Sequence, residues 1–358
     1  MGRLFGWLNN IVNPRDDGDD ASGQNKESVD RRKLVPQSGS RPAGDSGIDD
    51  ANYWWCFEGH PHEDIPLFDI INNNLIINDI KANIKSGALP VIEIPDNVMK
   101  TLRLLDDPEF SYRDVAQLIE RSPAMAGEFL KITNSSLMNT GSATIHDLRT
   151  ALPRLGKVKI KSMLYMYSSK INFMNKSVFD TLAVDIVEHS YAVGLIAGYL
   201  SQRYFTNPDV AFFAGLLHDI GKLAILKSIA DSYDIPKQPG MMFREEMFDR
   251  IFPELHEKVG LYIAQSWKIE DAVKAAILHH HDLYVSPNDY SSPEMVENIC
   301  CLINISDTIA RILGKGKHIG PVNIFHEDAA VRMNMAKNWS TVEFLNNIPG
   351  MMNFKLDR

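Results

Sequence analysis

The sequence has few cysteines and no long apolar run. Its three cysteines, Cys56, Cys300 and Cys301, have neither the spacing of a metal-binding cluster nor that of a disulfide framework. This usage is typical of a reducing compartment, so we expect a cytoplasmic protein. No run approaches the roughly 18 uninterrupted apolar residues of a membrane-spanning helix. The first residues also lack the basic start and small-residue cleavage site of a signal peptide.

Positive charge is also scarce. The 358 residues include 37 Lys and Arg against 46 Asp and Glu, which gives a net charge of −9. This balance argues against a general nucleic-acid-binding surface, although a small local phosphate site remains compatible with it. The hydrophobic content of 44% and the charged content of 23% are those of an ordinary globular protein with a sizeable core. A chain of this length holds two modest domains or one elongated helical domain.

Large apolar residues are almost missing from residues 13–50, which are rich in Asp, Gly, Ser, Arg and Pro. Such a segment buries too little surface to offset its ordering entropy, so we expect a disordered linker within an N-terminal segment 1–50. Before it, Met1–Val12 has apolar residues at helical spacing, which predicts a short amphipathic anchor for a membrane surface or a partner. The favoured interpretation is instead a frayed terminus or a helix that docks on its own protein. The aromatic cluster Tyr53–Phe57 opens the folded part. It is expected to pack on the first lobe, and the alternative is a recognition patch.

From Leu67 onward, apolar residues recur with helical periodicity, and no alternating strand pattern exceeds it. Ser111, Pro123 and Gly87 stand where helix starts and stops are expected. The sequence therefore predicts an all-α fold with two helical lobes, 51–176 and 177–318. A C-terminal extension, 319–358, is expected either to cap the second lobe or to contact a partner.

The stretch Asn207–Leu226 is the most informative part of the chain. Asn207 and Pro208 predict the start of a buried helix, and Gly221 is expected to end it. His218 and Asp219 would then lie on its last turn, against the core. A buried His-Asp pair needs a partner, and both side chains are common ligands of divalent metals. The alternative is a core histidine that is hydrogen-bonded to the neighbouring aspartate.

Further polar residues occupy inward-facing positions on separate predicted helices. Each of them would need a buried partner of its own, whereas one metal centre would satisfy them together. These residues are His189, His256, His280 and Asp307.

Several motifs in order along the chain resemble those of the HDOD family. They are Leu89-Pro90, Asp107–Ser111, Ile119–Pro123, Leu130–Ser135 and Ala151–Gly156. The likeness covers residues 80–313. HDOD proteins are bacterial signalling modules that are distantly related to HD-type phosphohydrolases. The resemblance implies a second lobe that is an HD-domain-like helical bundle, and signalling proteins as partners.

The resemblance extends to metal ligands. His189, His218, Asp219 and Asp307 match the HD superfamily residues that hold one metal. His256, His280 and His281 are similar to the extra ligands of HD-GYP phosphodiesterases, in which Asp219 would bridge two metals. Within His279–His281 the match assigns His280 and His281 as the ligands, and the alternative is a register shifted by one residue. The chain departs from HD-GYP after His281, where no Gly-Tyr-Pro follows, and this weakens the expectation of cyclic-di-GMP as substrate.

Such a ligand set suits phosphoester hydrolysis with one or two Fe, Mn or Zn ions. We therefore expect a metal-dependent phosphohydrolase or phosphodiesterase that acts on a nucleotide or cyclic dinucleotide. Asp219 and Lys222 are the predicted catalytic residues, with Lys222 holding a phosphate oxygen. The alternatives are a non-catalytic signalling output domain that binds a ligand or protein partner, and a scaffold with a metal-free core.

Overall fold

The computed structural model describes residues 53–57, 67–89, 92–135, 138–139, 141, 143–171, 179–205, 207–232, 248–283, 290–317 and 319–352. The predicted N-terminal segment 1–50, with the stretch Met1–Val12, lies outside them. The regular secondary structure of the described part is helical apart from one two-stranded antiparallel sheet, in which β1 (Cys56–Phe57) pairs with β2 (Val322–Asn323). The all-α prediction is confirmed. Within these residues, no helix is both long and apolar enough to cross a membrane.

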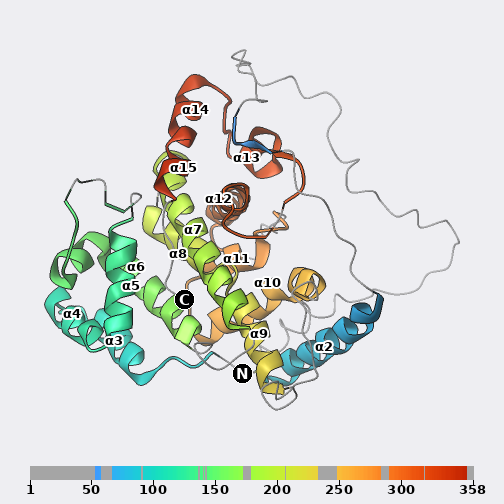
Figure 1. Ribbon diagram of the computed structural model, residues 1–358, viewed down its shortest axis with the longest axis horizontal. Coiled ribbons are helices and arrows are strands. Elements are labelled where there is room, and N and C mark those ends of the chain that lie inside the picture. The colour runs from blue at the N-terminus through green and yellow to red at the C-terminus, as the bar shows by residue number, and fades with distance from the viewer. Residues whose placement is uncertain are drawn as a thin grey trace, which may run out of the picture.

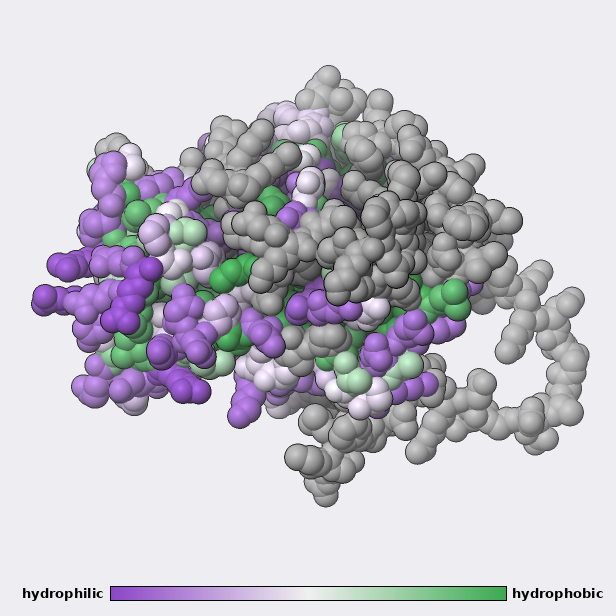
Figure 2. Space-filling view, turned by 60° about the horizontal axis from the view of Figure 1, so that its bottom comes forward, coloured by the Kyte–Doolittle hydropathy of each residue, from purple (hydrophilic) through white to green (hydrophobic). Residues whose placement is uncertain are grey.

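A first group of helices lies at the left of the molecule in Figure 1. It consists of α3 (Asp96–Asp106), α4 (Tyr112–Glu120), α5 (Pro123–Thr133) and α6 (Leu148–Ile171). Local sequence explains the starts of α4 and α5. The Ser111 and Ser122 hydroxyl oxygens accept hydrogen bonds from the backbone N–H groups of Asp114 and Met125, with O···N distances of 3.2 and 3.4 Å. Figure 2 shows hydrophilic side chains gathered over this end of the molecule.

The second group forms the centre of the molecule (Figure 1). It contains α7 (Asp180–Tyr204), α8 (Pro208–Leu217), α9 (Ile220–Ser232), α10 (Phe248–Ser266), α11 (Asp271–His279) and α12 (Pro293–Ile312). Its inner helix, α8, is buried from Ala211 to Leu217 and packs against α6, α7, α11 and α12. As predicted, the side chain of Asn207 caps this helix, and Pro208 is its first residue.

The two groups meet along α6, which packs on α8. The ring of Tyr165 stacks on those of Phe213 and Trp267, with centroids 6.2 and 5.0 Å away. A buried polar triad also joins α5, α6 and α7. In it, the Lys170 ammonium and the Tyr191 hydroxyl each donate to one oxygen of the Glu128 carboxylate at 2.9 Å. Burial, reinforced by the charge of Glu128, raises the pKa of Tyr191 well above its ordinary value and keeps the hydroxyl a donor.

Helix α2 (Leu67–Ser86) lies apart from α3–α6 and packs against α9 and α10 (Figure 1). Lys81 pairs with Glu254 of α10 at 2.5 Å, and Arg250 donates to Asn74 at 2.8 Å. The range 51–176 assigned to the first lobe therefore includes a helix whose contacts are with the second group. Local periodicity predicts that α2 exists, but its packing partner is a tertiary property.

The aromatic cluster corrects another expectation, because it packs on the C-terminal extension. Trp55 is fully buried, and its ring meets that of Phe325 edge to face at 5.8 Å. The pairing of β1 with β2 fixes this contact. The extension continues through η5 (Ile324–His326), α13 (Asp328–Arg332), α14 (Trp339–Asn346) and α15 (Ile348–Met351). Helix α13 packs on α12, and Phe344 of α14 stacks on Tyr199 of α7 at 4.4 Å. The extension therefore covers the second group of helices.

The helix end predicted at Gly221 is wrong. Helix α8 ends at Leu217, and α9 begins at Ile220, so Gly221 lies in the first turn of the next helix. Its role is close packing, since a Cβ at Gly221 would stand 1.9 Å from the carbonyl oxygen of His256 on α10. The chain turns at His218 and Asp219, which places both side chains at the junction of two buried helices.

Candidate metal centre

The structure brings together all seven side chains that the sequence predicts as metal ligands. They come from five places on the chain: α7 supplies His189, the α8–α9 junction His218 and Asp219, α10 His256, the end of α11 His280 and His281, and α12 Asp307. His281 is exposed, whereas the other six residues have at most 5% of their surface accessible. That these residues bind metal stays a prediction, which the following geometry supports.

Backbone carbonyls orient the four buried histidines. In each ring, Nδ1 lies within hydrogen-bonding distance of a carbonyl oxygen, which can only accept, so Nδ1 carries the proton. The pairs are His189 with Lys315 at 2.6 Å, His218 with Gly215 at 2.7 Å, His256 with Phe252 at 2.6 Å and His280 with Ile277 at 3.0 Å. The Nε2 lone pairs are then left for the interior. This is the usual arrangement around metal-binding histidines, whose second nitrogen donates to a carbonyl or carboxylate.

At one end of the cluster, which we call the first pole, His189, His218 and Asp307 lie together. Nε2 of His189 is 3.0 Å from Oδ1 of Asp307, and Nε2 of His218 is 3.3 Å from Oδ2 of Asp219. Because Nδ1 of each ring is protonated, a neutral ring would set its Nε2 lone pair against a carboxylate oxygen in each contact. Two acceptors at this distance repel unless a cation or a second ring proton lies between them. Although burial opposes it, the charge of Asp219 raises the pKa of His218, and this favours a second proton on that ring.

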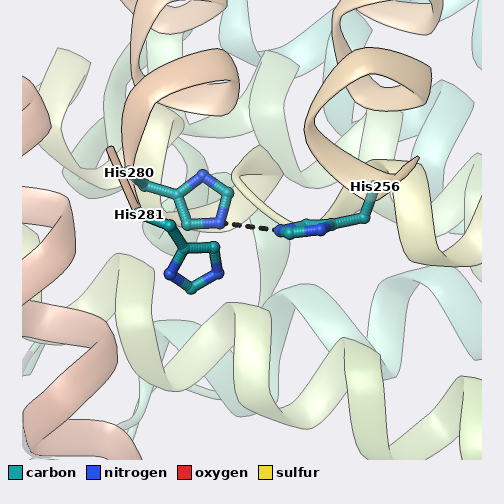
Figure 3. A group of neighbouring side chains, drawn as sticks. All are labelled: His256, His280 and His281. Carbon is teal, nitrogen blue, oxygen red and sulfur yellow. Dashed lines mark hydrogen bonds between the residues drawn. The ribbon is translucent and has the colours of Figure 1, made fainter. Parts of the chain in front are cut away.

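At the other end, the second pole, His256, His280 and His281 face one another (Figure 3). Nε2 of His256 is 3.1 Å from Nε2 of His280, and the ring of His281 lies 4.1 Å from that of His280. Burial lowers the pKa of His256 to about 3 and that of His280 well below its ordinary value, so both are neutral at pH 7. With both Nδ1 atoms protonated, two lone pairs point at each other.

Asp219 lies between the poles. Its Oδ2 faces His218 and His189, at 3.3 and 3.6 Å from their Nε2 atoms, and its Oδ1 faces His256 and His280, at 3.6 and 3.8 Å. Oδ1 is buried and has no hydrogen-bond partner among the described residues. Burial alone would raise the pKa of Asp219, but the charges of His218 and Lys222 outweigh it, and the pKa falls well below its ordinary value. The carboxylate is therefore ionised.

The donor set fits a divalent metal at either pole. A buried ionised carboxylate with an unpartnered oxygen is costly, and neutral imidazoles with carbonyl-fixed tautomers are ordinary metal ligands. The mixture of imidazole and carboxylate suits Fe, Mn or Zn. His279 stands apart from the cluster, and its ring is near that of Tyr290, with centroids 6.2 Å apart. The geometry thus agrees with the predicted register, in which His280 and His281 are the ligands.

Sequence reasoning missed three contributors to the site. The carbonyl of Lys315 orients His189, and Gly316, at φ 137°, lies so close that a Cβ there would stand 2.7 Å from Nδ1 of His189. The run Gly314-Lys315-Gly316 is the signal that could have indicated a tight turn there. Glu257 follows His256, and burial raises the pKa of its carboxyl to about 7.

Two pairs of glycines set how closely the ligand-bearing helices approach. A Cβ at Gly215 of α8 would lie 2.8 Å from Cα of Gly194 on α7, and one at Gly221 of α9 would lie 2.6 Å from the nitrogen of Gly260 on α10. Backbone therefore packs directly on backbone at both crossings. The first crossing joins the helices of the first pole, and the second joins Asp219 to the helix of His256.

Comparison with known proteins places this fold. The HDOD domain model matches residues 91–283. Two solved structures are similar to this chain, and each match covers 79% of it. One is a putative metal-dependent phosphohydrolase from Shewanella amazonensis SB2B, with 18% identity, a TM-score of 0.54 and 100% of its own chain covered. The other is an HDOD domain protein of unknown function from Geobacter sulfurreducens, with 19% identity, a TM-score of 0.53 and 98% of its own chain covered. An uncharacterized Treponema pallidum protein is 21% identical over an alignment of 224 residues, and the match covers 59% of this chain and 41% of that protein.

These likenesses show the fold, and the match to the family model covers more than half of the chain. The match begins before α3 and ends just after His281, so it includes every predicted ligand except Asp307. The chain belongs to the HDOD domain family.

Proposed function

We propose that the chain is an HDOD-type signalling protein with a mono- or dinuclear divalent metal centre that hydrolyses a phosphoester bond of a nucleotide or cyclic dinucleotide. The observation that carries this proposal is the meeting of two neutral imidazoles at the second pole beside a buried carboxylate oxygen without a partner among the described residues. Nε2 of His256 faces that of His280 at 3.1 Å, and Oδ1 of Asp219 is the unpartnered oxygen. A divalent cation bound by these atoms would remove the conflict.

The ligands divide between the poles with Asp219 in common. The first pole would use His189, His218 and Asp307, and the second pole His256, His280 and His281. Bound there, divalent metals supply Lewis acidity toward phosphoryl oxygens and lower the pKa of water. The two oxygens of Asp219 face different poles, which is the arrangement a shared ligand requires.

The rim of the centre carries cations suited to an anionic substrate. The side chains of Lys222 and Arg311 keep 23% and 28% of their surface exposed, and both lie beside ligand carboxylates. Lys222 is the proposed residue for holding a phosphate oxygen, because an ammonium group forms strong charge-assisted hydrogen bonds with phosphate. The burial of six of the seven ligands keeps bulk water from the poles, and this strengthens every charge interaction there.

The same burial favours a second candidate, a non-catalytic signalling output domain that binds a ligand or a protein partner. Structural metal sites are closed, whereas catalytic sites keep an open position. Only His281 among the seven residues is exposed. In this candidate, the metal would hold α7, α10, α11 and α12 together without turnover.

One experiment separates the candidates. The full chain, purified without metal-affinity resin, is analysed for metal by mass spectrometry and then screened with Mn²⁺ and Fe²⁺ on phosphomonoesters, linear dinucleotides and cyclic dinucleotides. Bound metal with hydrolysis that Asp219→Ala abolishes would support the enzyme. Bound metal without hydrolysis of any compound in the screen would favour the output domain. A chain that neither retains nor takes up metal would overturn both.

A further inference from the structure

Lys222 contacts the carboxylate of Asp219, which lies between the two poles. It lies in the first turn of α9, and its ammonium is 2.5 Å from Oδ2 of Asp219. The same ammonium lies 6.0 Å from the ring centroid of Phe252 on α10. Its side chain is 23% exposed, whereas that of Asp219 is 1% exposed. The cation therefore connects a buried anion with the rim of the centre.

The oxygen that Lys222 contacts is the one that faces the first pole. Nε2 atoms of His218 and His189 lie 3.3 and 3.6 Å from the same Oδ2. A cation held by the first pole would draw on this oxygen as well. Like charges a few ångströms apart in a buried environment repel strongly, because little water screens them. The ammonium and a divalent ion therefore cannot share Oδ2 without a cost to one of them.

We propose that Lys222 is a displaceable counter-charge, which competes with the metal for Oδ2 of Asp219 and, once displaced, binds a phosphate oxygen of the substrate. This inference rests on the proposed function and adds a regulatory step to it. Metal loading would then create the anion site. The exposed rim gives the ammonium a position to move to, with the face of Phe252 beside it.

Competition is a coupling between two sites, and its free energy is reciprocal. If a bound metal weakens the contact of Lys222 with Asp219, that contact weakens metal binding by the same free energy. Removing the positive charge should raise metal affinity, and it should also weaken phosphate binding to the loaded protein. A lysine that only stabilises the fold would not produce these two opposite changes. Their combination is the signature of displacement.

The test uses calorimetric titration of the full chain after its metal has been stripped with a chelator. Mn²⁺ is titrated first, and orthophosphate is then titrated into the stripped and the Mn²⁺-loaded protein. For Lys222→Met we expect Mn²⁺ to bind about tenfold more tightly and orthophosphate about tenfold more weakly in the loaded protein, as typical coupling factors suggest. The unsubstituted chain should bind orthophosphate at this site only when it is loaded.

A matched control is available on the same helix. Lys227 pairs with Asp231 one turn away at 3.1 Å, and its side chain has a similar exposure of 20%. Lys227→Met should change neither affinity. Lys222→Gln removes the charge but keeps a hydrogen-bond donor for Asp219. It therefore keeps the test valid if Lys222→Met does not fold. It should show the same two opposite changes.

The proposal is overturned if both neutral variants bind Mn²⁺ no more tightly than the unsubstituted chain, or if their loaded forms bind orthophosphate as well as it does. Binding of orthophosphate to the stripped and loaded chains with equal affinity would also overturn it. If the unsubstituted chain binds no metal, the metal centre itself fails, and the result is distinct from these. Failure of the lysine variants alone leaves the centre in place.

Discussion

Two buried polar clusters lie within the same helical body, and they differ in whether each buried acceptor has a hydrogen-bond donor. In the triad of Glu128, Lys170 and Tyr191, each donor meets an acceptor at 2.9 Å. In the candidate metal centre, by contrast, the Nε2 atoms of the neutral His256 and His280 face each other, and Oδ1 of Asp219 has no partner among the described residues. The triad is complete with protein atoms alone. A bound cation would complete the candidate centre.

The contrast shows how a structural polar cluster can be told from a binding site by counting donors. Both clusters are deeply buried and include charged groups, so burial and charge do not separate them. The pairing of donors with acceptors does, because a self-satisfied network holds elements together, whereas buried acceptors without a donor are typical of a site that binds a ligand. Four substitutions test this distinction, from the largest expected effect to the smallest.

Replacing Asp219 by alanine should break the centre and leave the triad intact. It removes the ligand that both poles share, so we expect loss of bound metal together with the stabilisation that metal gives. That stabilisation is about 4 kcal/mol when free metal is a thousandfold above its dissociation constant. Metal analysis and thermal unfolding with and without Mn²⁺ measure both effects. Full metal occupancy in Asp219→Ala would contradict the assignment.

Replacing Lys170 by methionine should do the opposite. It leaves the Glu128 carboxylate buried without its counter-ion, which typically costs about 3–5 kcal/mol. Denaturant unfolding measures the loss, and metal content per folded chain should not change. The double substitution Lys170→Met with Glu128→Leu should recover much of the stability, because a neutral apolar pair replaces the charges. A fall in metal stoichiometry in the single variant would show that the two clusters are coupled.

Tyr191→Phe removes one hydrogen bond from the triad and preserves packing. Since hydrogen bonds to charged groups contribute about 1.5–3 kcal/mol, we expect a loss within that range, smaller than for Lys170→Met. Tyr191 is two residues from His189 on α7, so unchanged Mn²⁺ affinity in this variant would show that the helix stays in place. A stability equal to that of the unsubstituted chain would show that the hydrogen bond from the Tyr191 hydroxyl to Glu128 does not stabilise the fold.

His279→Ala is the variant with the smallest expected effect. Its ring lies outside the cluster, so we expect a stability change within about 0.5 kcal/mol and full metal content. His280→Ala, its neighbour, should lose the metal of the second pole. Mass spectrometry of the two variants side by side decides the register. Metal lost from His279→Ala and kept in His280→Ala would reverse it.

Features that depend on neighbouring residues could be predicted from the sequence. The helix starts indicated by Ser111, Pro123 and Asn207 depend on three or four neighbouring residues, and the structure has all three. The inward position of His189 likewise follows from helical spacing. For the site, the periodicity gives the candidate side chains, but the carbonyl of Lys315 that fixes the His189 ring comes from 126 residues away.

Features that depend on distant contacts could not be predicted. Trp55 is one of several aromatic residues in a row, and nothing near it indicates that Phe325 is its partner. Gly221 resembles a helix end because glycine commonly ends helices, whereas its actual reason is the backbone of α10. A glycine required by a close approach is locally indistinguishable from one required by a turn.

The two helix crossings at glycine pairs also limit how the ligand-bearing helices can move. At Gly215 with Gly194, and at Gly221 with Gly260, the helices that carry the ligands already touch through their main chains. They have no room to move closer, since backbone atoms cannot interpenetrate. At these two crossings, α7 can move away from α8, and α10 away from α9, but neither pair can move closer. If the centre holds a metal, such a separation should weaken the binding of the cation.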